Sequence, residues 1–290
     1  MGGEGSLPNI VDLQSLDRDR IDGILDRAED LPPPLTSGRS PFAVMFFAEP
    51  STRTRISFGS ALAASGVAFD ALGLEDCKIS TGESLDDTLR VFQRTADLLI
   101  IRHPNPTTAH RAASLGLTVI SAGCGALHHP TQALVDAYTI RAHRGTVRDL
   151  SVAFVGNILS RSVHSLTELI AHYGASDIYL VSNDSLLRRY EGPGHKRESL
   201  LDVPSDVDVV YWVRHKDLDA GAVVTATGDR VLSSDVRKHF SATTAFLHPL
   251  PRAHEIPLEA DYDDRSMYWE QVENGSRVRQ ACIRYCLELS

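Results

Sequence analysis

Four short segments of the chain combine charged, hydroxyl or imidazole side chains with sharp backbone turns. They are Ser51-Thr52-Arg53-Thr54-Arg55, Arg102-His103-Pro104, His128-His129-Pro130-Thr131-Gln132 and His248-Pro249-Leu250-Pro251-Arg252. The first, second and fourth follow apolar runs typical of β-strands, and the first and third stand where a helix pattern begins. Because ligands of α/β proteins bind beyond the carboxyl ends of the strands, these segments are the candidate site.

The first segment has the composition of an anion site. A strand-to-helix turn leaves backbone N–H groups free at the positive end of the helix dipole. Hydroxyl groups add donors there, and the guanidinium of Arg53 adds a fork that matches phosphate oxygens. A plain helix cap is the alternative, since Ser and Thr are common N-cap residues. Two Thr, one Ser and two Arg within five positions favour the anion site.

The other three segments carry weaker signals when each is taken alone. Arg102 ends a strand and can reach a ligand oxygen, although exposed arginines at strand ends are common. A histidine at a helix start tends to stay neutral and can donate to a developing oxyanion, with Gln132 beside it, but it can equally be a capping residue. The two prolines around Leu250 can lock an unusual backbone or a cis peptide, which would present backbone carbonyls and Arg252 in defined positions.

The elements that position these residues alternate between strands and helices. Apolar runs predict strands at Ala43–Phe47, Val67–Leu72, Leu98–Arg102, Thr118–Ser121, Ser151–Val155, Ile178–Val181, Val207–Val213 and Thr244–Leu247. Helix-period stretches lie between most of them, a pattern that predicts βαβ units and parallel sheets covered on both faces. The fold class expected is therefore doubly wound α/β.

The pattern also predicts two domains. A helix over Pro130–His143 stops at Gly145, and a new strand begins near Ser151, so we place the boundary near residue 145. A last helix over residues 276–289 has an apolar stripe that contains Cys282 and Cys286, which we interpret as small core residues. The expected domains are residues 1–145, with the last helix (276–290) packed back on them, and residues 146–275.

Length and composition exclude several classes of protein. The 290 residues, with 42% hydrophobic and 23% charged, are typical of a globular protein, and the net charge of −9 argues against nucleic-acid binding. We find no apolar run of about 20 residues and no secretory leader, so no membrane association is expected. The four cysteines contain no C-x-x-C pair, which makes a zinc site improbable. A cytoplasmic enzyme with free thiols is expected.

Taken together and in this order, the four segments resemble the aspartate/ornithine carbamoyltransferase family. Further matches are Gly82-Glu83-Ser84, Arg161-Ser162-Val163-His164-Ser165-Leu166, Tyr211-Trp212-Val213-Arg214, and Asn274-Gly275 before Arg279-Gln280-Ala281. HPLPR points to the aspartate branch, because ornithine enzymes typically carry a Cys in that turn and an SMG motif, both absent here. The resemblance implies two doubly wound α/β domains, one for carbamoyl phosphate and one for the amino acid, with an interdomain active-site cleft.

The resemblance also implies a role for each matching residue. Ser51, Thr52, Arg53 and Thr54 would hold the phosphate. Arg102, His129 and Thr54 would bind the carbonyl oxygen, and Gln132 the carbamoyl amide, so that Arg53, Thr54, Arg102 and His129 are the expected catalytic residues. Arg161, Arg214 and Lys216 would bind the acceptor's carboxylates, and the backbone of Leu250 would face the amine. Such chemistry needs orientation and electrostatic stabilisation, and no metal or cofactor is expected.

Three positions depart from the family pattern. Thr81 stands where a Lys usually precedes Gly82-Glu83, in a loop that would carry Ser80 into a neighbouring subunit's site within a homotrimer. Lys216 replaces a Gln, and Cys124-Gly125 replaces an acidic stretch. Alternatives to aspartate carbamoylation are therefore transfer to another carboxylate-bearing amine, a non-catalytic paralogue, and, outside the family, a two-domain ligand-binding or scaffold protein.

Overall fold

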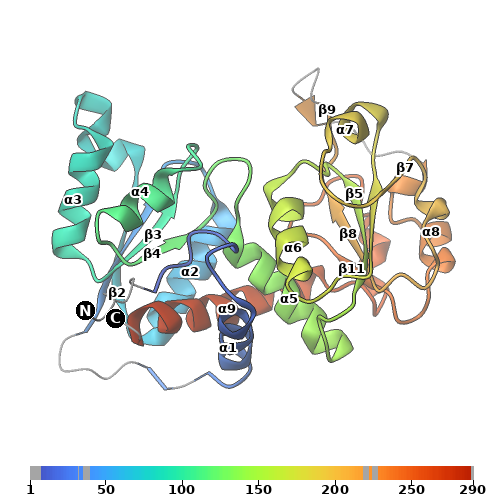
Figure 1. Ribbon diagram of the computed structural model, residues 1–290, viewed down its shortest axis with the longest axis horizontal. Helices are drawn as coiled ribbons and strands as arrows, with labels where there is room; N and C mark the ends of the chain where they lie inside the picture. Colours follow the sequence, from blue (N-terminus) through green and yellow to red (C-terminus); the bar gives the residue numbers. More distant parts are fainter. Residues whose placement is uncertain (1–7, 32, 35–39, 218–221, 224–227, 289–290) are drawn as a thin grey trace, which may run out of the picture. The chain divides into compact units, whose positions relative to one another are not determined.

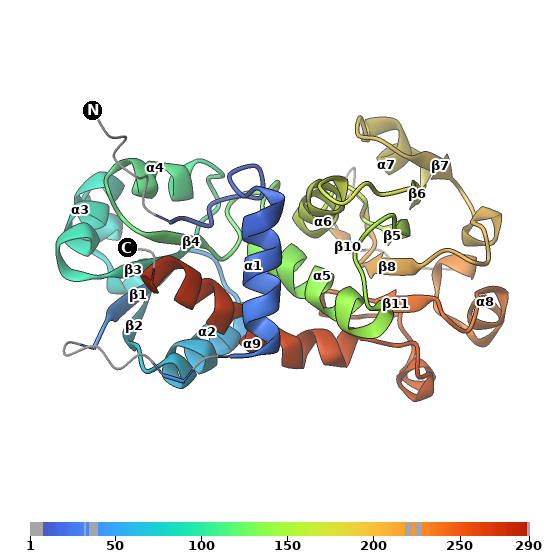
Figure 2. The ribbon, with the colours of Figure 1, turned by 60° about the horizontal axis from the view of Figure 1, so that its bottom comes forward.

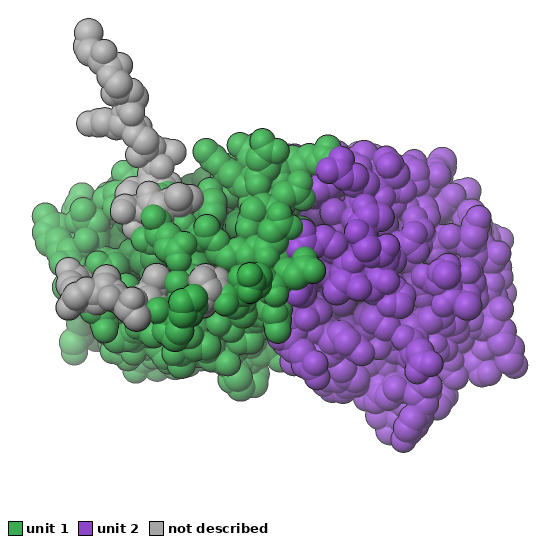
Figure 3. Space-filling model, turned by 90° about the horizontal axis from the view of Figure 1, so that it is seen from below, with its two compact units in different colours: residues 1–134, 275–290 green, residues 135–274 purple. Residues whose placement is uncertain are grey.

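The computed structural model describes residues 8–31, 33–34, 40–217, 222–223 and 228–288. The chain divides into two compact units, residues 1–134 with 275–290 and residues 135–274 (Figure 3). The dividing points fall inside two helices, α5 (Pro130–Arg144) and α9 (Tyr268–Glu288), so each of these helices contributes to both units. The domain limits expected near residues 145 and 275 stay predictions.

The first unit is built on a four-stranded parallel sheet (Figure 1). Its strand order is β2 (Ala68–Gly73), β1 (Phe42–Phe47), β3 (Leu98–Arg102) and β4 (Val119–Ser121). The connections between these strands contain α2 (Thr52–Ser65), α3 (Leu85–Thr95) and α4 (Thr108–Ser114). Two short 3₁₀ helices, Leu74–Asp76 and Lys78–Thr81, lie between β2 and α3.

Alternation along β1 assigns its residues to the two faces of this sheet. Val44 and Phe46 belong to an apolar cluster that includes Phe92 of α3 and Ala112 of α4. Met45 points to the opposite face, where its methyl group lies beside Gly59 of α2. Since successive strand residues face opposite sides, helices cover both faces, as a buried parallel sheet requires.

Two further helices complete the first unit. The C-terminal part of α9 packs beside α1 (Arg18–Glu29) (Figures 1 and 2), where Arg277 donates to the Ala28 carbonyl over 3.2 Å. Arg279 donates to Ser57 of α2 over 2.9 Å and stacks over the Phe58 ring. These contacts attach the end of the chain to its beginning within one core.

The second unit has a five-stranded parallel sheet (Figure 1). The order is β11 (Ala245–Leu247), β8 (Val209–Val213), β5 (Ser151–Gly156), β6 (Asp177–Val181) and β7 (His195–Arg197). Its other elements are α6 (Arg161–Ala171), α7 (Asp184–Arg189), α8 (Ser234–His239), the antiparallel pair β9 (Lys216–Asp217) and β10 (Ala222–Val223), and 3₁₀ helices at Leu200–Asp202, Gly228–Arg230 and Leu258–Tyr262.

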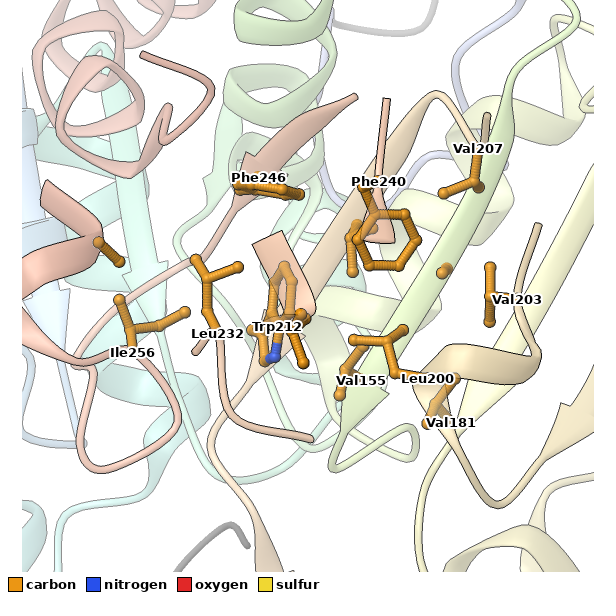
Figure 4. Packing of buried hydrophobic residues seen from close by; sticks show 14 of the residues in the cluster. Val155, Val181, Leu200, Val203, Val207, Trp212, Leu232, Phe240, Phe246 and Ile256 are labelled. Carbon is orange, nitrogen blue, oxygen red and sulfur yellow. The ribbon is translucent and has the colours of Figure 1, made fainter. Parts of the chain in front are cut away.

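Large side chains fill the core of the second unit (Figure 4). The rings of Trp212 and Phe246 meet edge to face, with centroids 5.7 Å apart, and Phe240 packs against Phe246. On the other face of the sheet, Phe154 and Tyr211 make a second edge-to-face pair. Such pairs add about 0.5–1.5 kcal/mol each to the burial of apolar area.

The α/β fold class and the predicted strands are confirmed, with ends that shift by one or two residues. The predicted start of the last helix is wrong, because α9 begins at Tyr268 and not at residue 276. The first turn buries Tyr268 and Gln271, but the exposed Trp269 and Val272 and the following Asn274-Gly275 interrupt the apolar stripe by which the later turns were recognised. Cys282 and Cys286 are fully buried in α9, and burial raises the pKa of both thiols, to about 12 for Cys282.

No helix in the described part of the chain is long and apolar enough to span a membrane.

Candidate active site

In the first unit, two of the predicted segments meet at one edge of the sheet. Strands β1 and β3 are neighbours, and Phe47 pairs with Arg102 at their carboxyl ends. The N–H of Ala48 donates to the Arg102 carbonyl over 2.8 Å, and Arg102 Nε lies 3.6 Å from Glu49 Oε2. The turn that opens α2 and the Arg102 guanidinium therefore share this edge, which the sequence predicted from strand ends alone.

The N-terminus of α2 differs from an ordinary capped helix. Ser51 is its N-cap residue in extended conformation, yet the Ser51 side chain makes no capping hydrogen bond. By contrast, Ser84 and Ser160 each accept from the backbone N–H three residues on. The plain-cap alternative would have required the same bond at Ser51, so its absence favours a site in which the hydroxyl serves a ligand.

The remaining side chains of this segment lie in different environments. Thr52 and Arg53 are exposed, whereas Thr54 is buried in the first turn of α2. Arg55 donates to the Ala71 carbonyl over 3.1 Å and thereby holds helix α2 to β2. Arg55 is thus a structural residue, whereas Arg53 is exposed in the first turn of the helix.

Gly123 brings Arg102 and His129 together. This glycine follows β4 with φ +104°, and a Cβ placed on it would stand 3.1 Å from His129 Cδ2 and 3.3 Å from Arg102 Nη1. The side chains of Arg102 and His129 therefore both pack against the backbone of Gly123, which has no side chain of its own. Arg102 also donates to the Ala122 carbonyl over 3.3 Å, and His129 is buried immediately before α5. The sequence patterns did not indicate Gly123, because a positive φ has no signature in the sequence beyond the glycine itself.

The loops behind this pair are tied to each other. The N–H of Gly125 donates to the His103 carbonyl over 2.9 Å, and Gly125 lies so close to Pro106 that a side chain there would collide. Cys124 is buried in the apolar cluster of the first unit. This burial explains why a small apolar residue stands at Cys124, where the family pattern has an acidic stretch. Burial also lowers the pKa of His103 from its ordinary value. Gln132 lies half-buried in the first turn of α5.

In the second unit, the predicted acceptor residues follow three neighbouring strands. β11, β8 and β5 are adjacent and parallel. Leu250 follows β11, Arg214 follows β8, and Arg161 opens α6 after β5. Arg214 Nε is buried without a hydrogen-bond partner among the described residues. Two guanidinium groups and a turn therefore stand at one sheet edge, an arrangement suited to carboxylates.

The turn after β11 has the unusual backbone that its prolines predicted. The Leu250–Pro251 peptide bond is cis, and Leu250 has φ +55°. The Leu250 N–H donates to His248 Nδ1 over 2.8 Å. Arg252 does not extend toward a ligand, because it forms a bidentate ion pair with Asp261 and stacks over Trp269.

The loop that differs from the family pattern is folded on itself. Thr81 ends a 3₁₀ turn, and its hydroxyl donates to the Lys78 carbonyl over 2.9 Å. Lys78 and Thr81 are exposed. The predicted site side chains of Ser80 and Lys216 lie outside the described part of the structure. That the two sets of site residues face one cleft stays a prediction.

The chain matches family models over nearly its whole length. The model described as "Aspartate/ornithine carbamoyltransferase, carbamoyl-P binding domain" matches residues 9–142. The model described as "Aspartate/ornithine carbamoyltransferase, Asp/Orn binding domain" matches residues 148–286. The chain therefore belongs to the aspartate/ornithine carbamoyltransferase family, as the motifs predicted.

Individual relatives point to the aspartate branch. The chain is 37% identical to the aspartate carbamoyltransferase catalytic subunit of Methanothrix thermoacetophila, over 97% of this chain and 98% of that protein. It is 34% identical to the catalytic subunit from Halorubrum lacusprofundi, over 97% and 95%. Among solved structures, Trypanosoma cruzi aspartate transcarbamoylase in complex with carbamoyl aspartate and phosphate superimposes with a TM-score of 0.84 at 28% identity, covering 95% of this chain and 94% of that one.

Proposed function

We propose that this protein transfers the carbamoyl group of carbamoyl phosphate to the amine of L-aspartate, giving N-carbamoyl-L-aspartate and phosphate. The observation that carries the proposal is the packing of Arg102 and His129 on Gly123, at the sheet edge that also bears the uncapped start of α2. Arg102 and His129 can bind the carbonyl oxygen of carbamoyl phosphate, and the adjacent N-terminus of α2 can bind its phosphate. The relatives named above support the same reaction.

The first unit is the proposed carbamoyl phosphate domain. Ser51, Thr52, Arg53 and Thr54 hold the phosphate through hydroxyl groups, the Arg53 fork and the backbone N–H groups of α2. Arg102, His129 and Thr54 bind the carbonyl oxygen, and Gln132 holds the carbamoyl amide. Because these groups lie on a buried sheet and two helix starts, they are arranged before the substrate arrives, which is what electrostatic stabilisation of a transition state requires.

The second unit is the proposed acceptor domain. Arg161 and Arg214, with Lys216, bind the two carboxylates of aspartate, and the backbone of Leu250 faces its amine. The amine nitrogen forms a bond to the carbamoyl carbon while the bond from that carbon to the phosphate oxygen breaks. Negative charge grows on the carbonyl oxygen, where Arg102 and His129 stabilise it, and the departing phosphate accepts the amine's proton.

The decisive experiment is an assay of carbamoyl transfer from carbamoyl phosphate across a panel of amino acids. Turnover with aspartate and no other amine supports the proposal. Turnover with a different carboxylate-bearing amine favours the alternative acceptor suggested by Thr81 and Lys216. Binding of a phosphate analogue without turnover identifies a non-catalytic paralogue.

We also propose that the protein forms a homotrimer through its first unit. β2 is an edge strand with a largely exposed start, and Phe69 on it lies over Gly59 of α2. Ile56, one helical turn before Gly59, is 67% exposed, and Phe69 is 39% exposed. Apolar side chains on an open sheet edge are typical of a subunit interface. In cyclic symmetry the loop around Ser80–Glu83 of each subunit can then reach the next site.

A further inference from the structure

A chain of buried hydrogen bonds runs behind the turn that contains Leu250. The side chains of His248 and Glu255 are 1% and 2% exposed, and His248 Nε2 lies 3.0 Å from Glu255 Oε1. The same carboxylate oxygen accepts from the Ala253 N–H over 2.9 Å. His248 and Glu255 therefore close the turn from the inside, and neither residue has a role in the reaction described above.

The contact of the second ring nitrogen of His248, Nδ1, determines which nitrogen of the imidazole carries the proton. His248 Nδ1 lies 2.8 Å from the backbone nitrogen of Leu250. A backbone N–H only donates, so Nδ1 must be unprotonated, and the ring proton is then on Nε2, where it donates to Glu255. Burial alone would raise the pKa of Glu255, but hydrogen bonds from His248 and Ala253 outweigh that effect and lower it. An ionised Glu255 can only accept hydrogen bonds, so it matches a His248 ring that carries its proton on Nε2.

The hydrogen bond from Leu250 partly offsets an unfavourable backbone conformation. Leucine at φ +55° lies in the left-handed region, which is unfavourable for an L-residue. The hydrogen bond from its N–H to His248 offsets part of that cost. Removing the His248 acceptor therefore removes an interaction that stabilises this orientation of the Leu250 peptide.

His248 is itself held by the buried core of the second unit. Its backbone N–H donates to Gln271 over 2.8 Å, and Gln271 donates to Asp136 over 2.7 Å. The hydroxyl of Tyr211 donates to the other oxygen of Asp136 over 2.8 Å. The turn is therefore linked through buried side chains to residues of α9, α5 and β8.

We propose that His248, oriented by Glu255, is a positioning residue that fixes the Leu250 backbone for contact with the amine of the acceptor. This inference rests on the proposed function, since it assigns the Leu250 backbone to the acceptor. It predicts that the unprotonated Nδ1 of His248 matters for acceptor kinetics and not for carbamoyl phosphate, whose proposed ligands belong to the first unit.

Three variants test the proposal. His248→Phe keeps a planar ring and removes the acceptor atom, and it should lower kcat/KM for aspartate by about 10²-fold, because small misplacements at a reacting centre have effects of that order. Carbamoyl phosphate affinity, measured by calorimetry, should not change. His248→Asn should recover most of the loss, because an Asn side chain accepts from the N–H two residues on. His239→Phe is the matched control, since His239 bonds the Val203 carbonyl over 3.0 Å elsewhere in this unit.

A spectroscopic measurement separates this inference from the proposed function. In ¹⁵N-histidine NMR of the wild-type protein, His248 should show a protonated Nε2 and an unprotonated Nδ1, whether or not the protein turns over aspartate. The opposite tautomer overturns the inference, as does unchanged aspartate kinetics in His248→Phe or failure of His248→Asn to rescue. Wild-type protein that shows the expected tautomer but no transfer to aspartate overturns the proposed function and leaves the positioning of Leu250 intact.

Discussion

At the scale of single residues, Arg53 and His129 should fail in different ways. Arg53→Ala removes a charge-assisted fork, and such bonds contribute about 1.5–3 kcal/mol each, so carbamoyl phosphate affinity should fall by at least tenfold. His129→Ala removes a donor that acts on the developing oxyanion, so kcat should fall by about 10²–10³ with little change in affinity. Calorimetry and steady-state kinetics on both variants measure the contrast. If only KM rises in His129→Ala, the residue binds substrate or caps α5.

His215 gives the chain an acid-sensitive stability. Burial, assisted by Arg230, lowers its pKa to about 4 from the ordinary 6.5, and its Nε2 has no hydrogen-bond partner among the described residues. Between these values the unfolded chain binds a proton that the folded chain does not, so stability falls as the pH falls. From pH 7 to pH 5 the loss from this residue should be about 2 kcal/mol.

Urea unfolding of His215→Leu at the two pH values checks this expectation. The variant should lose less stability on acidification than the wild-type protein. His164→Ala, which changes an exposed histidine of the same unit, should behave like the wild type. An equal acid loss in His215→Leu and the wild type would show that other groups carry the effect.

At the scale of elements, the Gly123 turn decides how Arg102 and His129 meet. Gly123→Ala would force a Cβ to within 3.1 Å of the His129 ring, so the imidazole must shift and kcat should fall. Gly145→Ala is the matched control, because Gly145 also has positive φ, at +77°, but nothing within 4 Å of its Cβ position. Both variants should lose about 1 kcal/mol of stability from the left-handed backbone. A similar kcat in the two variants would contradict the role assigned to Gly123.

At the scale of the whole molecule, the proposed trimer predicts active sites that two subunits share. Subunits with Arg53→Ala and subunits that lack residues 79–83 should each be inactive alone. When equal amounts of the two are dissociated, mixed and reassembled, random association should restore about one quarter of the sites, since one neighbour supplies Arg53 and the other the loop. Activity and light scattering of the mixture measure this. Hybrid trimers that form without regaining activity would show that the loop does not act across the interface.

The sequence by itself determined the parallel α/β class and the strands that precede the site. These follow from local patterns, because apolar runs bounded by turn residues have few alternatives in a chain of this composition. The motifs themselves led to the family. Local patterns failed where the apolar periodicity is interrupted, as in the first turns of α9, and where an element is polar throughout, as in β7 (His195–Arg197).

Only the tertiary structure decided which side chains act together. Arg102 and His129 are far apart in sequence, and they meet because β3 and β4 pair in register and Gly123 leaves room between them. Likewise, His248 and Glu255 gained a role only when the turn closed on itself in a buried environment. Hydrogen-bond geometry and burial depend on contacts between distant segments, and the periodicity of a single segment does not record those contacts.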